Sequence, residues 1–250
     1  MYDEGHVDQA RCIALTQEHR GHGVSTTAYY LGRVLVAQGL RVLLVDLTGR
    51  RARLNTLVAR GPIKNLVFWA PPLARPEDAR PVLEQARKQT AGRADVILLD
   101  VDAALLERTG GFALGLDYVV AVTEHTQAGQ DAADRIAQRL KDERPPHGKV
   151  GVVFSRVDAP TAAELPDHTD GRGLPVLGYY PADYLLAGGD AYSLKGNESS
   201  WPHDTYLYAL LRLGQTLKQV VPLHRVGGLV GMNQTQLPQE HNGHARDVNP

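Results

Sequence analysis

Residues 11–47 read RCIALTQEHRGHGVSTTAYYLGRVLVAQGLRVLLVDL, and this stretch decides how the rest of the chain is interpreted. The short apolar run at 12–16 is typical of a buried parallel strand. After a glycine-bearing loop, apolar residues at helical spacing predict a helix over 25–38. The continuously apolar run at 41–45 predicts a second buried strand, with Asp46 at its tip. The order strand, loop, helix, strand is typical of an α/β protein with a parallel sheet.

Apolar runs and helical patterns alternate along the rest of the chain. This alternation predicts an α/β fold with a mostly parallel, twisted sheet and helices on both faces. Pro81 lies inside one predicted helix and favours a regular start only at that residue. Further strands are expected at 66–69, 95–100, 117–123, 149–155 and 175–178, and further helices at 76–90, 127–143 and 205–221.

Length and composition indicate one soluble domain. The 250 residues carry 27 Lys and Arg against 28 Asp and Glu, so the net charge of -1 gives no global reason to bind nucleic acid or an anionic membrane. No apolar run approaches the roughly 18 residues of a spanning helix, and the polar start argues against a secretory signal. We expect a cytoplasmic protein with a flexible lead at 1–10, a single domain at 11–221 and a polar tail at 222–250.

The loop after the first strand has the layout of a phosphate-binding loop. Gly21 and Gly23 allow backbone N–H groups to wrap an anion, and the start of the following helix adds partial positive charge. Such a loop normally also carries a lysine, followed by a Ser or Thr that holds Mg²⁺. This loop contains no lysine.

The sequence at 19–26, HRGHGVST, resembles the deviant Walker A loop of the ParA/MinD family of P-loop ATPases, usually written KGGVGKTT. In this alignment Val24 stands at the Walker lysine and Ser25 at the magnesium-binding hydroxyl. His19 stands at the family's signature lysine, which reaches across a dimer to the partner's nucleotide. A register shifted by one residue would place Arg20 there, but the glycines would no longer match. The loop therefore resembles a degenerate Walker A motif.

Two later strands resemble the same family. RVLLVD at 41–46 is similar to its VLLID strand, and Thr48 replaces a second aspartate that the family links to hydrolysis. DVILLD at 95–100 is similar to the Walker B strand, which implies that Asp100 lies near Mg²⁺ or its water.

The resemblance continues toward the C-terminus and covers roughly residues 11–221. VGVVFSR at 150–156 is similar to a strand that ends in an Asn-Arg pair near the base, and here the pair is Ser155 and Arg156. The segment LGYYPAD is similar to a family motif that contains Pro181.

The resemblance implies a nucleotide site. The expected cofactor is ATP or ADP with Mg²⁺, and a protein without a cofactor is the alternative. The candidate catalytic residues are Asp46 and Asp100, which would also hold Mg²⁺ together with Ser25. The cofactor-binding residues that the resemblance implies are Gly21, His22, Gly23, Val24, Ser25, Thr26, Arg156 and Pro181.

The altered charges favour weak or absent hydrolysis, because phosphoryl transfer depends on positioning and charge stabilisation. The main hypothesis is a ParA/MinD-like positioning or scaffold protein that resembles the CpaE/TadZ branch of the family. The resemblance implies a homodimer and a protein partner in a partition, pilus or secretion system. One alternative is an active ATPase that acts in partitioning, septum placement or pilus or secretion assembly through an ATP-dependent dimer. Another is a metabolic ligase of the same broad fold.

Two segments suggest surface roles. Arginines between Arg50 and Arg60 form a cluster that is expected to be a solvated face, with non-specific DNA or a protein partner as alternatives. Residues 220–232 occupy the place of a membrane-targeting helix in MinD-like proteins. Pro222 and Gly227 make this segment a poor amphipathic helix, so membrane contact is not expected.

Overall fold

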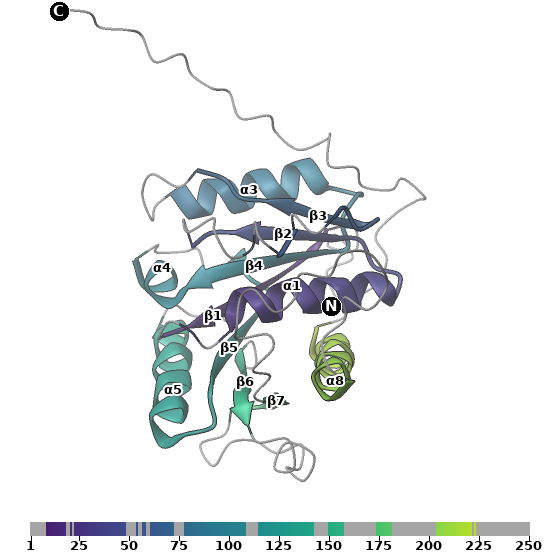
Figure 1. The fold of residues 1–250 in the computed structure, drawn as a ribbon. Coiled ribbons are helices and arrows are strands. Elements are labelled where there is room, and N and C mark those ends of the chain that lie inside the picture. Colours follow the sequence, from purple (N-terminus) through teal and green to yellow (C-terminus); the bar gives the residue numbers. More distant parts are fainter. Residues whose placement is uncertain are drawn as a thin grey trace, which may run out of the picture.

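Seven parallel strands form the centre of the molecule in a computed structural model of the chain (Figure 1). Their order in the sheet is β3-β2-β4-β1-β5-β6-β7, and all six pairings are parallel. The predicted parallel α/β fold is therefore confirmed. The strands are β1 (Arg11–Gln17), β2 (Val42–Asp46), β3 (Leu66–Trp69), β4 (Val96–Asp102), β5 (Tyr118–Glu124), β6 (Val150–Val157) and β7 (Val176–Pro181).

The structure describes residues 9–18, 21, 23–48, 54, 57–58, 61–72, 78–108, 115–142, 150–157, 174–181, 204–221 and 223. The arginine cluster predicted between Arg50 and Arg60 lies outside these residues. So do the predicted lead and tail, apart from residues 9, 10 and 223. The proposed domain bounds remain a prediction.

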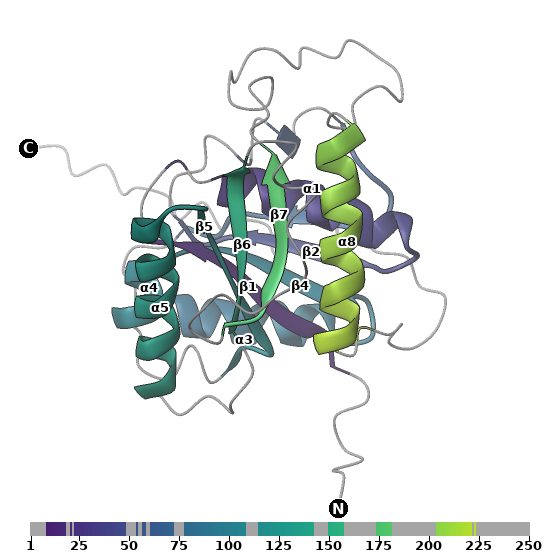
Figure 2. The ribbon, with the colours of Figure 1, turned by 90° about the horizontal axis from the view of Figure 1, so that it is seen from below.

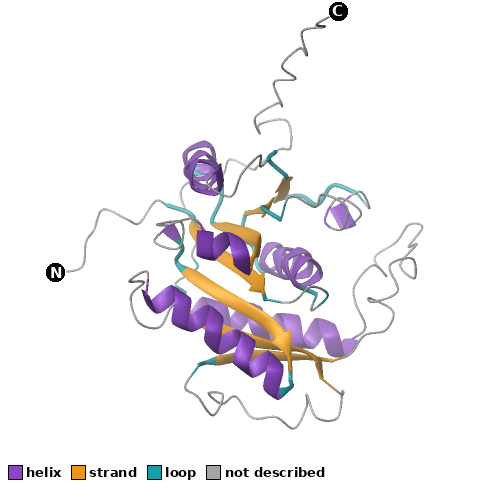
Figure 3. Ribbon diagram, turned by 90° about the vertical axis from the view of Figure 1, so that its left-hand side faces the viewer, coloured by secondary structure: helices purple, strands orange, loops and turns teal. Residues whose placement is uncertain are grey.

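Helices cover both faces of the sheet (Figures 2 and 3). Side chains of α3, α4 and α5 join one apolar core, and those of α1 and α8 join the core on the other face. None of the helices in the described part of the chain combines the length and apolar character that a membrane span requires. The helices are α1 (Val24–Ala37), α3 (Ala79–Thr90), α4 (Ala103–Arg108), α5 (Gln127–Asp142) and α8 (Asp204–Val220).

Two helix predictions need correction. The helix α3 begins at Ala79 and not at Pro81. The reason is that a proline is tolerated in the first turn, where the backbone N–H groups have no partner within the helix. The short helix α4 was not predicted. It follows β4 directly, and its six residues are too few to establish a helical period.

A buried ion pair joins the starts of β2 and β4. Arg41 is 1% exposed and Asp95 is 0% exposed. The Arg41 Nη2 lies 2.7 Å from the Asp95 Oδ1, and the Arg41 backbone N–H donates to the Asp95 Oδ2 over 2.7 Å. The Arg41 Nη1 donates to the carbonyl of Gly92. The pair therefore fixes two strands whose opposite ends carry Asp46 and Asp100.

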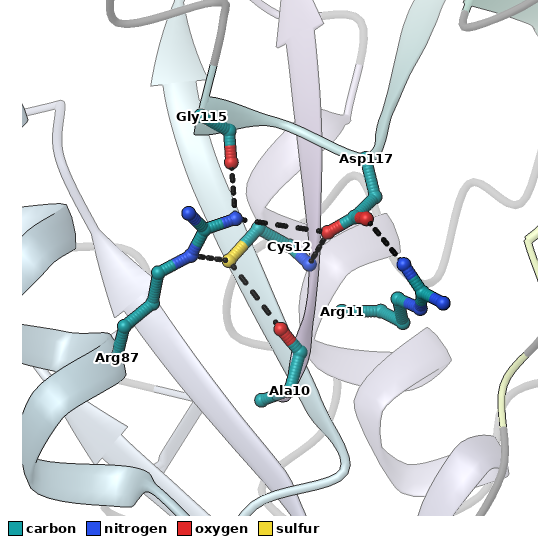
Figure 4. A network of polar contacts seen from close by, with 6 residues as sticks. All are labelled: Ala10, Arg11, Cys12, Arg87, Gly115 and Asp117. Atoms are coloured by element: carbon teal, nitrogen blue, oxygen red, sulfur yellow. Dashed lines mark hydrogen bonds and ion pairs between the residues drawn. The ribbon is translucent and has the colours of Figure 1, made fainter. Parts of the chain in front are cut away.

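A second polar network lies at the start of β1 (Figure 4). Arg87 of α3 donates to the Cys12 Sγ over 3.1 Å and to the carbonyl of Gly115. Asp117 accepts from the backbone N–H of Cys12 over 2.7 Å and from the Arg11 side chain over 2.9 Å. Burial raises the pKa of the Cys12 thiol to about 11, despite the opposing effect of Arg87. The thiol is thus a packed, protonated group in a network that ties α3 and β5 to β1.

We expect the Asp95→Ala variant to lose about 3–5 kcal/mol of unfolding free energy, because it leaves the Arg41 guanidinium buried without its carboxylate. Urea denaturation followed by circular dichroism measures this loss. Glu84→Ala is the matched control, since it removes the partner of Arg80 in an exposed pair and should cost at most about 1 kcal/mol. An Asp95→Ala loss as small as that of the control would contradict the role given to the buried pair.

Candidate functional site

The loop between β1 and α1, residues 18–23, is termed the phosphate loop. Gly21 and Gly23 have φ values of 94° and 90°, a left-handed region that glycine adopts without steric cost. Gly23 is the N-cap of α1, and no side-chain hydrogen bond caps this helix start. Such a start is suited to an anion, because its first N–H groups have no partner within the helix. His19 and His22 lie outside the described residues.

Two acidic residues meet at the carboxyl edge of the sheet beside this loop. Asp46 ends β2 and pairs in register with Asp100 of β4. The two residues are 3% and 1% exposed. The pKa of Asp100 is raised to about 7, mainly by burial and also by the charges of Asp46 and Asp102, against the lowering effect of a hydrogen bond with Ser25. Asp100 therefore holds a proton far more readily than an exposed aspartate.

Thr48 contacts Asp46 directly. Its backbone N–H and its hydroxyl donate to the Asp46 Oδ1 over 2.9 Å and 2.6 Å. The residue that replaces the family's second aspartate thus adds no negative charge. It instead holds the Asp46 carboxylate in place.

Val24 occupies the first turn of α1 and is 1% exposed. Its side chain belongs to the apolar core on the α1 face, together with Ala28 and Leu31. Thr26, two residues later, is also buried. No cation can therefore come to the phosphate loop from position 24, where the Walker lysine is expected.

Arg156 reaches the phosphate loop from β6. Its Nη2 donates to the carbonyl of Gly21 over 2.9 Å, and its Nη1 donates to the Glu124 Oε1 over 2.7 Å. Ser155, by contrast, donates its hydroxyl to the carbonyl of Thr123 inside the sheet. Pro181 ends β7, which β5 and β6 separate from β1. Arg156 and the loop are thus in contact.

Sequence patterns missed the ion pairs that hold the loop. Glu18 accepts from Arg135 of α5 through both carboxylate oxygens, with distances from 2.6 to 3.0 Å. Arg139, one turn later, lies 3.7 Å from the same carboxylate. The only local signal in the sequence for these ion pairs is the four-residue spacing of Arg135 and Arg139 on a predicted amphipathic helix. The partner, 117 residues away, depends on the fold.

The oxygen set of Ser25, Asp46 and Asp100 is of the kind that Mg²⁺ prefers. The Oδ2 of Asp100 is buried without a hydrogen-bond partner among the described residues, and a cation would satisfy it. In the part of the chain that the structure describes, no cluster of three or more His, Cys, Asp or Glu side chains is placed to hold a metal. The set therefore fits an ion that also takes ligands from water or a phosphate, and not an all-protein metal cage.

Comparisons with known proteins show which solved structures share this fold. Neither the protein-family models nor the curated protein sequences give a match. Among solved structures, the septum site-determining protein MinD of Pyrococcus horikoshii, complexed with Mg-ADP, has a TM-score of 0.64 at 17% identity, over 84% of this chain and 97% of that one. The chain has the fold of the MinD and ParA ATPases.

Two further structures agree. A chain of the MinC:MinD cell division protein complex of Aquifex aeolicus has a TM-score of 0.61 at 20% identity, over 88% of this chain and 100% of that one. A putative plasmid partition protein of Borrelia burgdorferi bound to AMPPNP has a TM-score of 0.60 at 14% identity, over 85% and 100%. At these identities the likeness concerns the fold.

We expect Asp100 to make the protein less stable as the pH rises from about 4 to 7. Below its ordinary pKa of 3.8 the carboxyl is protonated in both the folded and the unfolded chain. Between 3.8 and about 7 the unfolded chain ionises first, so the unfolding free energy falls, by about 4 kcal/mol in total. Urea denaturation across this pH range should show the fall in the wild type and not in Asp100→Asn.

Glu84→Gln is the matched control for this prediction, because Glu84 is an exposed carboxyl on α3 and is not among the groups that shift the pKa of Asp100. The control should keep the pH dependence of the wild type. Parallel pH profiles of the wild type and Asp100→Asn would contradict the raised pKa.

Proposed function

We propose that this chain is a ParA/MinD-like positioning or scaffold protein whose nucleotide site has weak or absent ATP hydrolysis. The observation that carries the proposal is the burial of Val24 at the position of the Walker lysine. A hydrogen bond from a charged donor to phosphate contributes about 1.5–3 kcal/mol, or one to two tenfold steps in affinity. Loss of this hydrogen bond weakens the binding of nucleotide in the ground state moderately. The same loss removes positive charge that stabilises the transition state of phosphoryl transfer.

The remaining residues support nucleotide binding in the proposed site. The glycine conformations at Gly21 and Gly23 and the uncapped start of α1 suit a phosphate group. Ser25, Asp46 and Asp100 would hold Mg²⁺, which neutralises phosphate charge when it is bound. The other cofactor-binding residues of the proposal are His22, Val24, Thr26, Arg156 and Pro181. The Mg-ADP and AMPPNP complexes of similar structures support the choice of nucleotide.

A homodimer and a protein partner belong to the same proposal. The MinC:MinD complex provides a structural parallel for a partner protein. A cytoplasmic location, a CpaE/TadZ-like role in pilus or secretion assembly and a role in partitioning all remain predictions from the resemblance.

An active ATPase is the second candidate function. The observation that favours it is the retained set of Ser25, Asp46 and Asp100 at one edge of the sheet. The two candidates differ in turnover, since both allow nucleotide to bind.

Isothermal titration of the purified chain with Mg·ATP, paired with a phosphate-release assay, tests the proposal. We expect binding without steady phosphate release. Micromolar binding together with steady release would overturn the non-hydrolysing proposal and favour the active ATPase. Absence of binding to Mg·ATP and Mg·ADP would overturn the nucleotide site.

We further expect Val24→Lys to raise the affinity for Mg·ATP about tenfold or more, because the new ammonium restores a charged contact to phosphate. The aliphatic stem of the lysine can follow the apolar path that Val24 occupies now. Val24→Met is the matched control, since it adds length without charge. Equal affinities for the two variants would mean that the loop does not present a phosphate to position 24.

A further inference from the structure

The contact between Arg156 and the phosphate loop comes from a deformed strand. The pairing of β6 with β7 shifts register between Phe154 and Val157, which is the signature of a bulge. Arg156 lies inside this shift and has a φ of 58°. A positive φ is unfavourable for a residue with a side chain. Bulges next to functional sites often change the direction of a side chain, and here the Arg156 guanidinium points to the carbonyl of Gly21.

Glu124 holds the guanidinium on its other side. It ends β5 and pairs in register with Ser155, the neighbour of Arg156. Its carbonyl accepts from the backbone N–H of Thr126 over 2.8 Å. A side chain at Gly129 would collide with that same carbonyl, so the start of α5 packs directly on it. The backbone that carries the Glu124 carboxylate is therefore held on two sides.

Stability does not explain this arrangement. The side chains of Arg156 and Glu124 are 55% and 33% exposed, and ion pairs so exposed contribute little to folding. The strained backbone also opposes folding. The contact instead fixes the carbonyl of Gly21, one of the two left-handed glycines of the phosphate loop. A Cβ at Gly21 would lie 3.8 Å from the Arg156 Nη2, so the guanidinium rests against this part of the loop.

We propose that Arg156 is a positioning residue of the phosphate loop: Glu124 holds its guanidinium, which fixes the Gly21 carbonyl and so sets the loop for an anionic ligand. The choice of ligand, a nucleoside di- or triphosphate with Mg²⁺, rests on the proposed function. The action of Arg156 on the loop does not, because both of its contacts are made to groups of the chain itself. Arg156 thus supports the phosphate loop from β6, and the buried Val24 provides no positive charge beside the loop.

Hydrogen exchange of the ligand-free full chain, read by mass spectrometry on peptides that span residues 17–27, tests the structural part. We expect about tenfold faster exchange of the loop amides in Arg156→Ala, the factor that the loss of a charge-assisted hydrogen bond gives. Arg156→Lys should restore part of the protection, because an ammonium keeps the charge but lacks the rigid planar fork that meets two acceptors at fixed positions. Arg80→Ala, which removes another exposed arginine, is the control and should leave these peptides unchanged. Unchanged loop exchange in Arg156→Ala overturns the proposal.

The role of Glu124 is tested by combining variants. Because Glu124 acts through Arg156, the double variant Glu124→Ala with Arg156→Ala should exchange no faster than Arg156→Ala alone. Additive increases would overturn the part given to Glu124.

Calorimetric titration with Mg·ATP and Mg·ADP tests the ligand part. We expect Arg156→Ala to bind about tenfold more weakly than the wild type, at a melting temperature equal to that of Arg80→Ala. If the wild type binds neither nucleotide, the proposed function fails, and the exchange result still decides whether Arg156 positions the loop. If wild type and Arg156→Ala bind equally well, the positioning role fails while the proposed function stands.

Discussion

Two carboxylates share one buried edge of the sheet, and the rest of the site depends on how this charge is balanced. Parallel register places Asp46 beside Asp100, and the charge of Asp46 opposes the ionisation of Asp100. No cation is among the described groups that shift the pKa of Asp100. Hydroxyl groups contact the two carboxylates instead: Thr48 donates to Asp46, and Ser25 forms a hydrogen bond with Asp100. Asp100 therefore retains a proton more readily than an exposed aspartate does. A divalent cation at this edge would favour the ionised form of Asp100.

The phosphate loop, by contrast, is held by cations that come from other elements of the fold. Arg135 holds Glu18 at the end of β1, and Arg156 holds the Gly21 carbonyl. Both arginines come from elements on the β5–β6 side of the sheet. The loop is thus supported by side chains that are bound to protein acceptors. A lysine at position 24 would point its charge inward to a ligand, whereas Val24 adds apolar packing there.

The strands and long helices could be predicted from the sequence, because a run such as VILLD or an amphipathic period is a local signal. The parallel sheet and the meeting of Asp46 with Asp100 follow from the same signals, since the ends of parallel strands share one edge. The buried Arg41–Asp95 pair joins residues 54 positions apart, and Arg135 and Glu18 are 117 apart. Such pairs depend on register and on the placement of helices, which no local pattern contains. The bulge at Arg156 was missed for the same reason.

Binding and hydrolysis make different demands on a site of this kind. Binding of phosphate uses backbone N–H groups, glycine conformations and a helix start, none of which requires a lysine. Hydrolysis requires charge where the transition state develops it, and contacts that serve ground and transition states equally do not accelerate it. In this chain the two left-handed glycines of the loop and the acid pair are present, and position 24, where the resemblance predicts a lysine, holds a buried valine. Under the proposed function, the fold can therefore keep a ligand-responsive edge, with Ser25 and Asp100 linked by a hydrogen bond, without the charge that turnover requires.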